Sequence, residues 1–365
     1  MEQINSLQAY FEELSDPRME AKCDHVLLDI VSLSICATIA GADDWQAIET
    51  FGKSKEKWLR QWLELSNGIP SHDTLERVFQ KLDPGEFETC FIAWAGNMFK
   101  KMPDQVVAID GKTLRGTTEK LHLVSAWASE SGISLGHAKV DSKSNEITAI
   151  PELLKVLMLK GCIVTIDAMG CQKQIAQQIV DKQADYVLAV KGNQGTLHEY
   201  LQARFNFSDD SRFLNHEQPQ YSETVERRNG QTETRRCWVF SDSEVVARGW
   251  ANCQTIIRVT CERQTHDNLD QETRYFISTL PAQPALLLVY VRAHWGIENS
   301  FHWVLDVVFK EDRARTQHQT AALNLAVLRR IALNLIKRHP AKASLKQKRY
   351  RAALNEDFLL EVCQS

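Results

Sequence analysis

The stretch Cys162–Gln194, which reads CIVTIDAMGCQKQIAQQIVDKQADYVLAVKGNQ, decides the fold class. Short apolar runs that are bounded by turn residues predict strands at 162–166 and 186–190. Between them, apolar residues at spacings of three and four predict a helix over 172–182. A strand, a helix and a strand in succession indicate two parallel strands joined by a crossover helix.

The sequence before this stretch completes the pattern. Apolar runs predict strands at 106–109, 121–128 and 133–140, a helix is expected over 146–159, and a further helix begins near Gln194. Three successive strands without a helix suit an antiparallel meander, and the later alternation suits parallel strands. The predicted fold class is therefore α/β, with an RNase H-like mixed sheet.

The flanking sequence predicts additions to this sheet. Asn229-Gly230 within 224–240 is a strong hairpin signal, so the polar, β-rich sequence there is interpreted as an insertion. Ser71 is expected to cap a helix near the N-terminus. The domains expected are an N-terminal helical domain over 1–100, the first part of the catalytic domain over 101–206, a β-rich insertion over 207–280, a helical part of the catalytic domain over 281–338, and a basic C-terminal tail over 339–365. The helical domain either docks DNA or is a scaffold that packs on the sheet.

Composition excludes several classes of protein. With 365 residues, of which 44% are hydrophobic, the chain can bury a sizeable core. The apolar run Leu27–Ala42 contains Asp29 and is too short to span a membrane, and the first residues do not look like a signal peptide. The nine cysteines include no Cys-x-x-Cys pair. We therefore expect neither a disulfide framework nor a thiolate zinc site, and a reducing, cytoplasmic environment.

Positive charge is concentrated in one segment of an acidic chain. The net charge is −4, yet Arg313–Arg351 holds eleven Lys or Arg residues and no Asp or Glu. A concentrated basic segment is what a phosphate-binding surface requires. The segment is therefore predicted to bind DNA, with the contacts made by Lys346, Lys348, Arg349 and Arg351.

Two aspartates follow predicted strands. Asp110 ends the run that starts at Val106, and Asp167 ends the run that starts at Cys162. Ligands of such sheets are usually held at the carboxyl ends of the strands, and adjacent strands would bring both carboxylates within reach of one cation. Aspartate after a strand is also a common turn former or helix cap, so each motif alone is a weak signal.

A third candidate acid lies in Arg292–Asp306. On a helix, His294, Glu298 and His302 are four residues apart and fall on one face, beside Trp295. A carboxylate among aromatic residues needs a strong partner, which favours Glu298 as a metal ligand. The same pattern also fits a core helix with satisfied polar groups. A zinc hydrolase that uses the two histidines is a rival, although it leaves both aspartates unexplained.

The chain resembles the H-repeat-associated transposases, which belong to the DDE group of bacterial insertion-sequence enzymes. The resemblance rests on blocks that occur in order: Asp16–Arg18, Ile109–Thr113, Ser144–Glu146, Asp167–Lys173, Val190–Gln194 and His294–Val307. It implies an RNase H-like core with an inserted β domain, and a metal-binding triad of Asp110, Asp167 and Glu298. It also implies Mg²⁺, with Mn²⁺ as a substitute, and double-stranded DNA as the substrate.

The resemblance implies a mechanism as well. Water attacks first and frees a 3′ hydroxyl at the end of the element, and that hydroxyl then attacks the target DNA. Paired cutting of two ends predicts a homodimer. Lys112, Lys191 and Arg292 are candidate phosphate contacts. Related enzymes have Tyr, Arg and Lys at the positions of Val291, His294 and Leu305, so Arg292 or His294 is expected to take over a phosphate contact.

Two alternatives bear on the triad. A degenerate copy that binds DNA without catalysis is the alternative to an active enzyme. Within the same helical region, Asp306, Glu311 and Asp312 compete with Glu298. We expect Glu298, because Glu311 and Asp312 adjoin Arg313 and Arg315 and look like solvated ion pairs. Asp306 lies two helical turns beyond Glu298, about 12 Å away, too far for both to bind one Mg²⁺.

Overall fold

Three antiparallel strands begin the sheet in the computed structural model. They are β1 (Gln105–Leu114), β2 (Leu121–Ala128) and β3 (Ile133–Val140). β4 (Cys162–Ile166) and β5 (Asp185–Val190) follow, with β4 parallel to both β1 and β5. The predicted succession of strands and helices along the chain and the RNase H-like mixed sheet are confirmed. The structure describes residues 7–19, 23–99, 105–117, 120–141, 145–209, 218–228, 230–265, 268–314, 316 and 318–365.

One expected boundary was wrong. β1 does not end at Asp110 but continues to Leu114, because residues 110–114 pair with 121–125 of β2. Asp110 therefore lies inside a strand, where it pairs with Ser125 of β2. Three residues named in the sequence analysis, Ser144, Asn229 and Arg315, lie outside the described residues.

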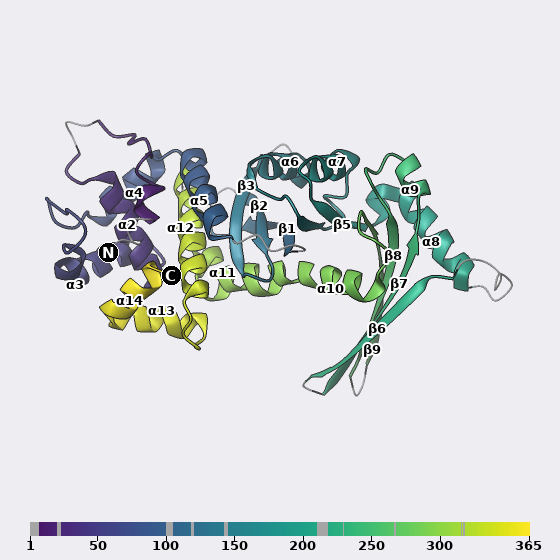
Figure 1. The fold of residues 1–365 in the computed structure, drawn as a ribbon. Helices are drawn as coiled ribbons and strands as arrows, with labels where there is room; N and C mark the ends of the chain where they lie inside the picture. Colours follow the sequence, from purple (N-terminus) through teal and green to yellow (C-terminus); the bar gives the residue numbers. More distant parts are fainter. Residues whose placement is uncertain are drawn as a thin grey trace.

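Helices cover both faces of the sheet (Figure 1). α6 (Glu146–Val156), α7 (Lys173–Asp181) and α8 (Gly195–Asp209) share a core with Val107 and Ile109 of β1. Val106 instead packs in a core with α10 (Pro284–His294), and Ala108 packs in the core that contains α11 (Trp303–Val307) and α12 (Gln319–Arg338). Because strand side chains alternate between faces, the even-numbered residues of β1, Asp110 included, face α10 to α12.

The β-rich insertion extends the same sheet. It contains β6 (Gln220–Arg228), β7 (Gln231–Ser241), α9 (Glu244–Ala247), β8 (Thr255–Gln264) and β9 (Leu269–Ser278). β9 pairs antiparallel with β5, so the described strands form one sheet in the order β3-β2-β1-β4-β5-β9-β8-β7-β6. In Figure 1 the long hairpins of this part project downward, past α10 (Pro284–His294), from the end of the molecule opposite the N-terminal helices.

The helical periodicity expected from residue 286 to 337 is interrupted. After α10 comes η4 (Glu298–His302), a single π-helical turn, which continues into α11 (Trp303–Val307). Lys310 has φ 51°, which ends this run before the short η5 (Glu311–Arg313) and the long α12 (Gln319–Arg338). A π turn adds a residue to the helix and changes which side chains share a face, and such turns are frequent at functional sites.

The N-terminal helices pack around α12. α2 (Leu27–Ile39), α3 (Trp45–Leu59), α4 (His72–Lys81) and α5 (Pro84–Met98) share one apolar core with it. Ser71 caps α4 as predicted, because its hydroxyl accepts a hydrogen bond from the Thr74 amide. Asn324 of α12 donates to the carbonyls of Phe79 and Leu82. Asn334 bonds both the amide and the carbonyl of Ser134 in β3, so α12 ties the helices to the sheet.

The C-terminal segment was expected to be a basic tail, and the structure corrects this. It forms α13 (Leu345–Leu354) and α14 (Glu356–Cys363), whose apolar side chains complete the core around α2. Ser344 and Gln347 form a reciprocal capping box at the start of α13. The two ends of the chain lie close together in Figure 1. Over the described residues, no helix is both long and apolar enough to cross a membrane.

Candidate active site

Register pairing places two aspartates side by side. Ile109 of β1 is the partner of Ile166 in β4, and the next residues are Asp110 and Asp167. Both carboxylates line a cavity of about 370 Å³, and Glu298 lines it from the π turn of η4. The structure therefore brings the three predicted acids to one cavity.

Asp110 is the most perturbed of these acids. Its side chain is 18% exposed, and burial together with the charge of Asp167 raises the pKa of Asp110 to about 7. Glu146 and Glu298 raise it further. A carboxyl group whose pKa is raised by like charges lies where a cation would be stabilised.

Asp167 is held by backbone amides. Its Oδ1 accepts hydrogen bonds from the amides of Met169 and Gly170, at 3.0 and 3.3 Å. Burial nevertheless raises the pKa of Asp167, and the charge of Glu146 adds to this. The loop after β4 thus orients this carboxylate within the cavity.

Glu298 does not have the environment that the sequence suggested. Its side chain is exposed on the cavity wall rather than buried among aromatic residues. The two histidines on its helix lie deeper. Burial lowers the pKa of His294 to about 4 and that of His302 to about 3, so both are neutral at pH 7. His294 Nδ1 lies 3.0 Å from Thr165 Oγ1, and His302 Nδ1 lies 3.6 Å from Asp110 Oδ2.

Glu146 is a fourth acid that sequence reasoning did not single out. It lies in the first turn of α6, and its Oε1 is 2.7 Å from His122 Nε2. A Cβ on Gly111 would come within 2.0 Å of Glu146 Oε1, so the glycine is what allows this close approach. The block Asn145-Glu146 was the available signal, but only the folded chain brings it beside Asp110 and Asp167.

Two basic side chains border the acids. Lys191 is exposed on the cavity wall, and its charge acts on Asp167 to lower the pKa of that carboxyl group. Arg274 of β9 stacks over the ring of Trp295 at 4.1 Å and pairs with Glu272 at 2.7 Å. Arg274 was not predicted, because nothing in its own strand marks it.

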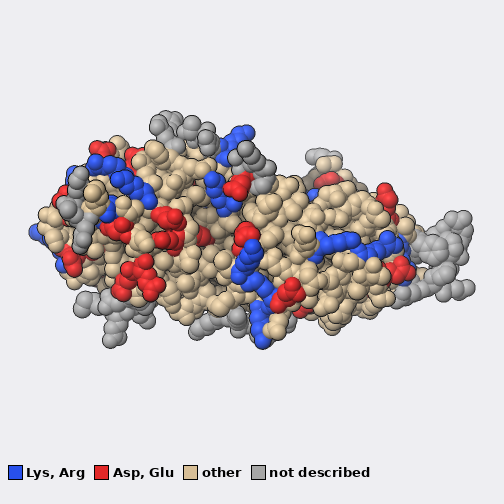
Figure 2. Space-filling model, turned by 90° about the horizontal axis from the view of Figure 1, so that it is seen from above, with Lys and Arg blue, Asp and Glu red and all other residues tan. Residues whose placement is uncertain are grey.

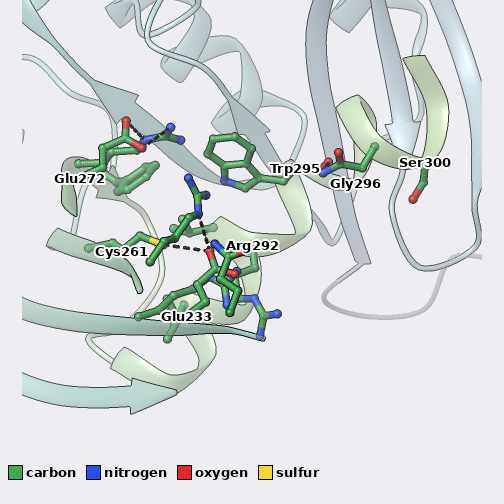
Figure 3. A pocket seen from close by; sticks show the side chains of 16 residues that line it. Glu233, Cys261, Glu272, Arg292, Trp295, Gly296 and Ser300 are labelled. Atoms are coloured by element: carbon green, nitrogen blue, oxygen red, sulfur yellow. Dashed lines mark hydrogen bonds and ion pairs between the residues drawn. The ribbon is translucent and has the colours of Figure 1, made fainter. Parts of the chain in front are cut away.

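A second cavity of about 490 Å³ adjoins the first (Figure 3). Arg274 and Trp295 belong to the walls of both cavities. Arg292 lines only the second, where its guanidinium lies 2.6 Å from Glu226 Oε1. Of the two residues expected to contact phosphate in place of the missing arginine, Arg292 is thus engaged with the insertion, and His294 lines the first cavity and bonds Thr165.

The structure does not place Lys112 where it can contact DNA. Its side chain is only 8% exposed, and its ammonium group donates to Asp306 Oδ1 and to Glu311 Oε2, the latter at 2.9 Å. Glu311 is fully buried and also pairs with Arg330 at 3.1 Å. The expectation that Glu311 forms a solvated ion pair was therefore wrong.

Part of the basic C-terminal segment is also buried. Lys348 donates to the carbonyls of Ile336 and His339, and Arg349 pairs with Asp43 at 2.9 Å. Both side chains are less than 10% exposed and hold α13 in place, which corrects their assignment as DNA contacts. Lys346 and Arg351 remain exposed. On the face seen in Figure 2, Lys and Arg lie in separate groups with Asp and Glu between them.

The donor set suits a hard divalent cation. Carboxylate oxygens are the ligands that Mg²⁺ prefers, and the raised pKa values of Asp110 and Asp167 indicate negative charge that such an ion would offset. Within the described residues, no three His, Cys, Asp or Glu side chains converge closely enough to hold one ion. Sharing an ion therefore requires Glu298 to approach the aspartates. The structure does not support the zinc hydrolase alternative, because His294 contacts Thr165 whereas His302 lies against Asp110.

An RNase H-like sheet with one aspartate within β1, a second directly after the paired strand β4, and a glutamate on a later helix is the arrangement of DDE nucleic-acid-processing proteins. Comparison with known families agrees. Residues 101–335 match the model described as "Transposase DDE domain", and residues 8–95 match the model described as "DDE_Tnp_1-associated". The chain belongs to the transposase DDE family.

Curated relatives carry the same designation. The chain is 40% identical to "Putative transposase YncI" of Escherichia coli O157:H7, over 99% of this chain and 95% of that protein. It is 35% identical to "H repeat-associated putative transposase YhhI" of Escherichia coli strain K12, over 99% and 98%. A piggyBac transposase synaptic complex with hairpin DNA covers 98% of this chain and 77% of its own, at 11% identity and TM-score 0.44, a likeness too weak to add to the assignment.

Proposed function

We propose that this protein is an active transposase that cuts the DNA ends of an insertion sequence and joins them to target DNA in a metal-dependent reaction. The observation that carries the proposal is the cavity shared by Asp110, Asp167 and Glu298, with the aspartates set side by side by the pairing of Ile109 with Ile166. Family membership supports the same chemistry.

In this proposal Asp110, Asp167 and Glu298 hold the divalent ions, Mg²⁺ or Mn²⁺. When bound, two such ions activate the attacking oxygen and stabilise the leaving oxygen of a phosphodiester. The backbone amides of Met169 and Gly170 orient the Asp167 carboxylate. His302 lies against Asp110 as a neutral ring, so it adds no positive charge that would compete with a cation.

Phosphate binding falls to side chains at the rim. Lys191 is exposed beside Asp167, where it would contact the backbone of the strand being cut. Lys346 and Arg351 on α13 are the exposed basic residues left from the predicted DNA-binding segment. Because two ends must be cut together, we propose that a homodimer assembles on double-stranded DNA.

The test is cleavage of a duplex that carries the ends of the element. Purified protein should nick it with Mg²⁺ or Mn²⁺ and not with EDTA or with Ca²⁺ alone. Glu298→Gln should abolish cleavage, and Glu152→Gln, at an exposed glutamate of α6, should not. Undiminished cleavage in EDTA would reject the metal mechanism. DNA binding without any cleavage in Mg²⁺ or Mn²⁺ would identify a degenerate copy. Zinc that copurifies with the protein would favour the zinc hydrolase alternative.

A further inference from the structure

Lys112 lies two residues beyond Asp110 on β1, so both side chains point to the face of the sheet covered by α10 to α12. Four charged residues meet there, and we call them the Lys112 cluster: Lys112 of β1, Asp306 of α11, Glu311 of η5 and Arg330 of α12. Each of these side chains comes from a different element. The cluster therefore joins the strand that bears Asp110 to the helix that bears Glu298.

The cluster is buried and internally paired. Lys112 Nζ contacts Asp306 and lies 2.9 Å from Glu311, whose other oxygen lies 3.1 Å from Arg330. Glu311 and Arg330 have no exposed side-chain surface, and Lys112 has 8%. Asp306 is the most accessible member, with 34% of its side chain exposed. An ion pair enclosed in this way resists screening by salt and water.

Contacts between β1 and the helical segment η4–α11 recur at matching intervals along this face. Asp110 meets His302 at 3.6 Å, and Lys112, two residues later, meets Asp306, four residues after His302. Two strand residues advance about 6.6 Å and four helical residues advance about 6 Å, so contacts at these intervals repeat without strain. Glu298 begins the π turn that ends at His302. The Lys112–Asp306 contact thus sets the register in which Glu298 and His302 stand against Asp110.

We propose that Lys112 is a positioning residue that holds the Glu298 helix in register with the Asp110 strand, so that the three acids can bind metal together. The proposal rests on the proposed function. Loss of Lys112 leaves Asp306 and Glu311 without the cation that joins them. The helix can then shift along the strand, and Glu298 moves relative to Asp110.

The experiment compares Lys112→Met, Lys112→Arg and Asp306→Asn with a matched control, Lys139→Met. Lys139 is an exposed lysine of the same sheet that bonds Gln319. Asp306→Asn removes only the accessible member of the cluster and keeps the Lys112–Glu311 pair, so it should fold even if Lys112→Met does not. Full-length proteins are compared in three assays: Mn²⁺ affinity by electron paramagnetic resonance, hydrogen exchange of residues 297–307, and cleavage.

Lys112→Met should weaken Mn²⁺ binding at least tenfold and speed exchange in 297–307, and Asp306→Asn should do the same to a smaller extent. Lys112→Arg should restore most of the affinity, and Lys139→Met should match the wild type. Folded Lys112→Met and Asp306→Asn variants with wild-type affinity and exchange would overturn the proposal. A weaker salt dependence of DNA binding with unchanged exchange would make Lys112 a phosphate contact instead. If the wild type itself does not cleave, the proposed function fails, whereas the exchange assay still decides the role of Lys112.

Discussion

Asp110 in β1 and Asp167 directly after β4 each lie one residue beyond a member of the Ile109–Ile166 pair, the last pair that these two parallel strands form. Backbone pairing, rather than an attraction between the side chains, holds the two carboxylates together. Burial, together with the charge of Asp167, raises the pKa of Asp110 to about 7. The fold therefore maintains an unfavourable charge arrangement, and the stability of the protein should depend on how that charge is neutralised.

The pH dependence of stability should report the raised pKa of Asp110, which burial and the charge of Asp167 cause. In the folded protein the pKa of Asp110 is about 7, against about 3.9 in an unfolded chain. Below pH 4 the group is protonated in both states and has no effect. As pH rises from 4 to 7, the unfolded state loses this proton while the folded state largely keeps it, so the free energy of unfolding falls. At 1.36 kcal/mol per unit of pKa difference, the loss is on the order of 4 kcal/mol.

Asp110→Asn removes this penalty. In EDTA the variant should be more stable than the wild type at pH 8 by a few kcal/mol, with the difference vanishing near pH 4. Urea denaturation at a series of pH values measures it. Asp312→Asn, at a partly exposed acid outside the cavity, is the control. A constant difference between Asp110→Asn and the wild type over the whole range would show that Asp110 has an ordinary pKa.

Removing the charge of Glu298 should affect cleavage, whereas removing the charge of Glu311 should affect stability. Glu298→Gln should keep the fold and DNA binding but lose cleavage, because the exposed amide keeps the shape without the charge that holds metal. Glu311→Gln should instead destabilise the protein by roughly 3–5 kcal/mol, because it leaves the buried Arg330 without its carboxylate partner and Lys112 with Asp306 alone. Thermal unfolding and cleavage are measured on both variants. If Glu298→Gln cut DNA like the wild type, the triad assignment would be wrong.

The exposed and buried basic residues should separate in a salt titration. Lys191→Ala should weaken DNA binding and reduce the slope of log affinity against log salt by about 1, and the pair Lys346→Ala with Arg351→Ala by up to about 2. Lys348→Ala and Arg349→Ala should lower the melting temperature, since both side chains bond inside the protein. An unchanged slope for Lys191→Ala would remove that residue from the DNA path.

Gly111 should not tolerate a side chain. In Gly111→Ala the new Cβ would meet Glu146 Oε1 at 2.0 Å and His122 Nε2 at 2.7 Å, so the Glu146 and His122 side chains must move and their contact with each other is disturbed. We expect a loss of about 1–3 kcal/mol in stability and a larger loss of cleavage. Gly192→Ala is the matched control, because its Cβ would meet nothing within 4 Å. Equal stability and activity of the two variants would mean that Glu146 can move away freely.

The sequence predicted the succession of strands and helices along the chain and the capping of α4 by Ser71. It also predicted that Asp110 and Asp167 come after apolar runs. Each depends on residues within about a dozen positions of one another, where periodicity and turn chemistry act directly. The prediction that Glu298 acts with the two aspartates came from the family resemblance and from the helical spacing. In the structure, Glu298 lines the same cavity as both aspartates.

Tertiary structure decided which charged side chains stay exposed to solvent and which are buried in ion pairs. Lys112 and Glu311 are 199 residues apart in the chain, and Arg349 and Asp43 are 306 apart. No local pattern distinguishes a lysine that will be buried against such a partner from one that stays in water. The same holds for Glu146 beside Gly111 and for the pairing of β9 with β5. Sequence alone determined the elements and their acids, because these arise from local periodicity, whereas burial and charge pairing arise only when distant segments pack together.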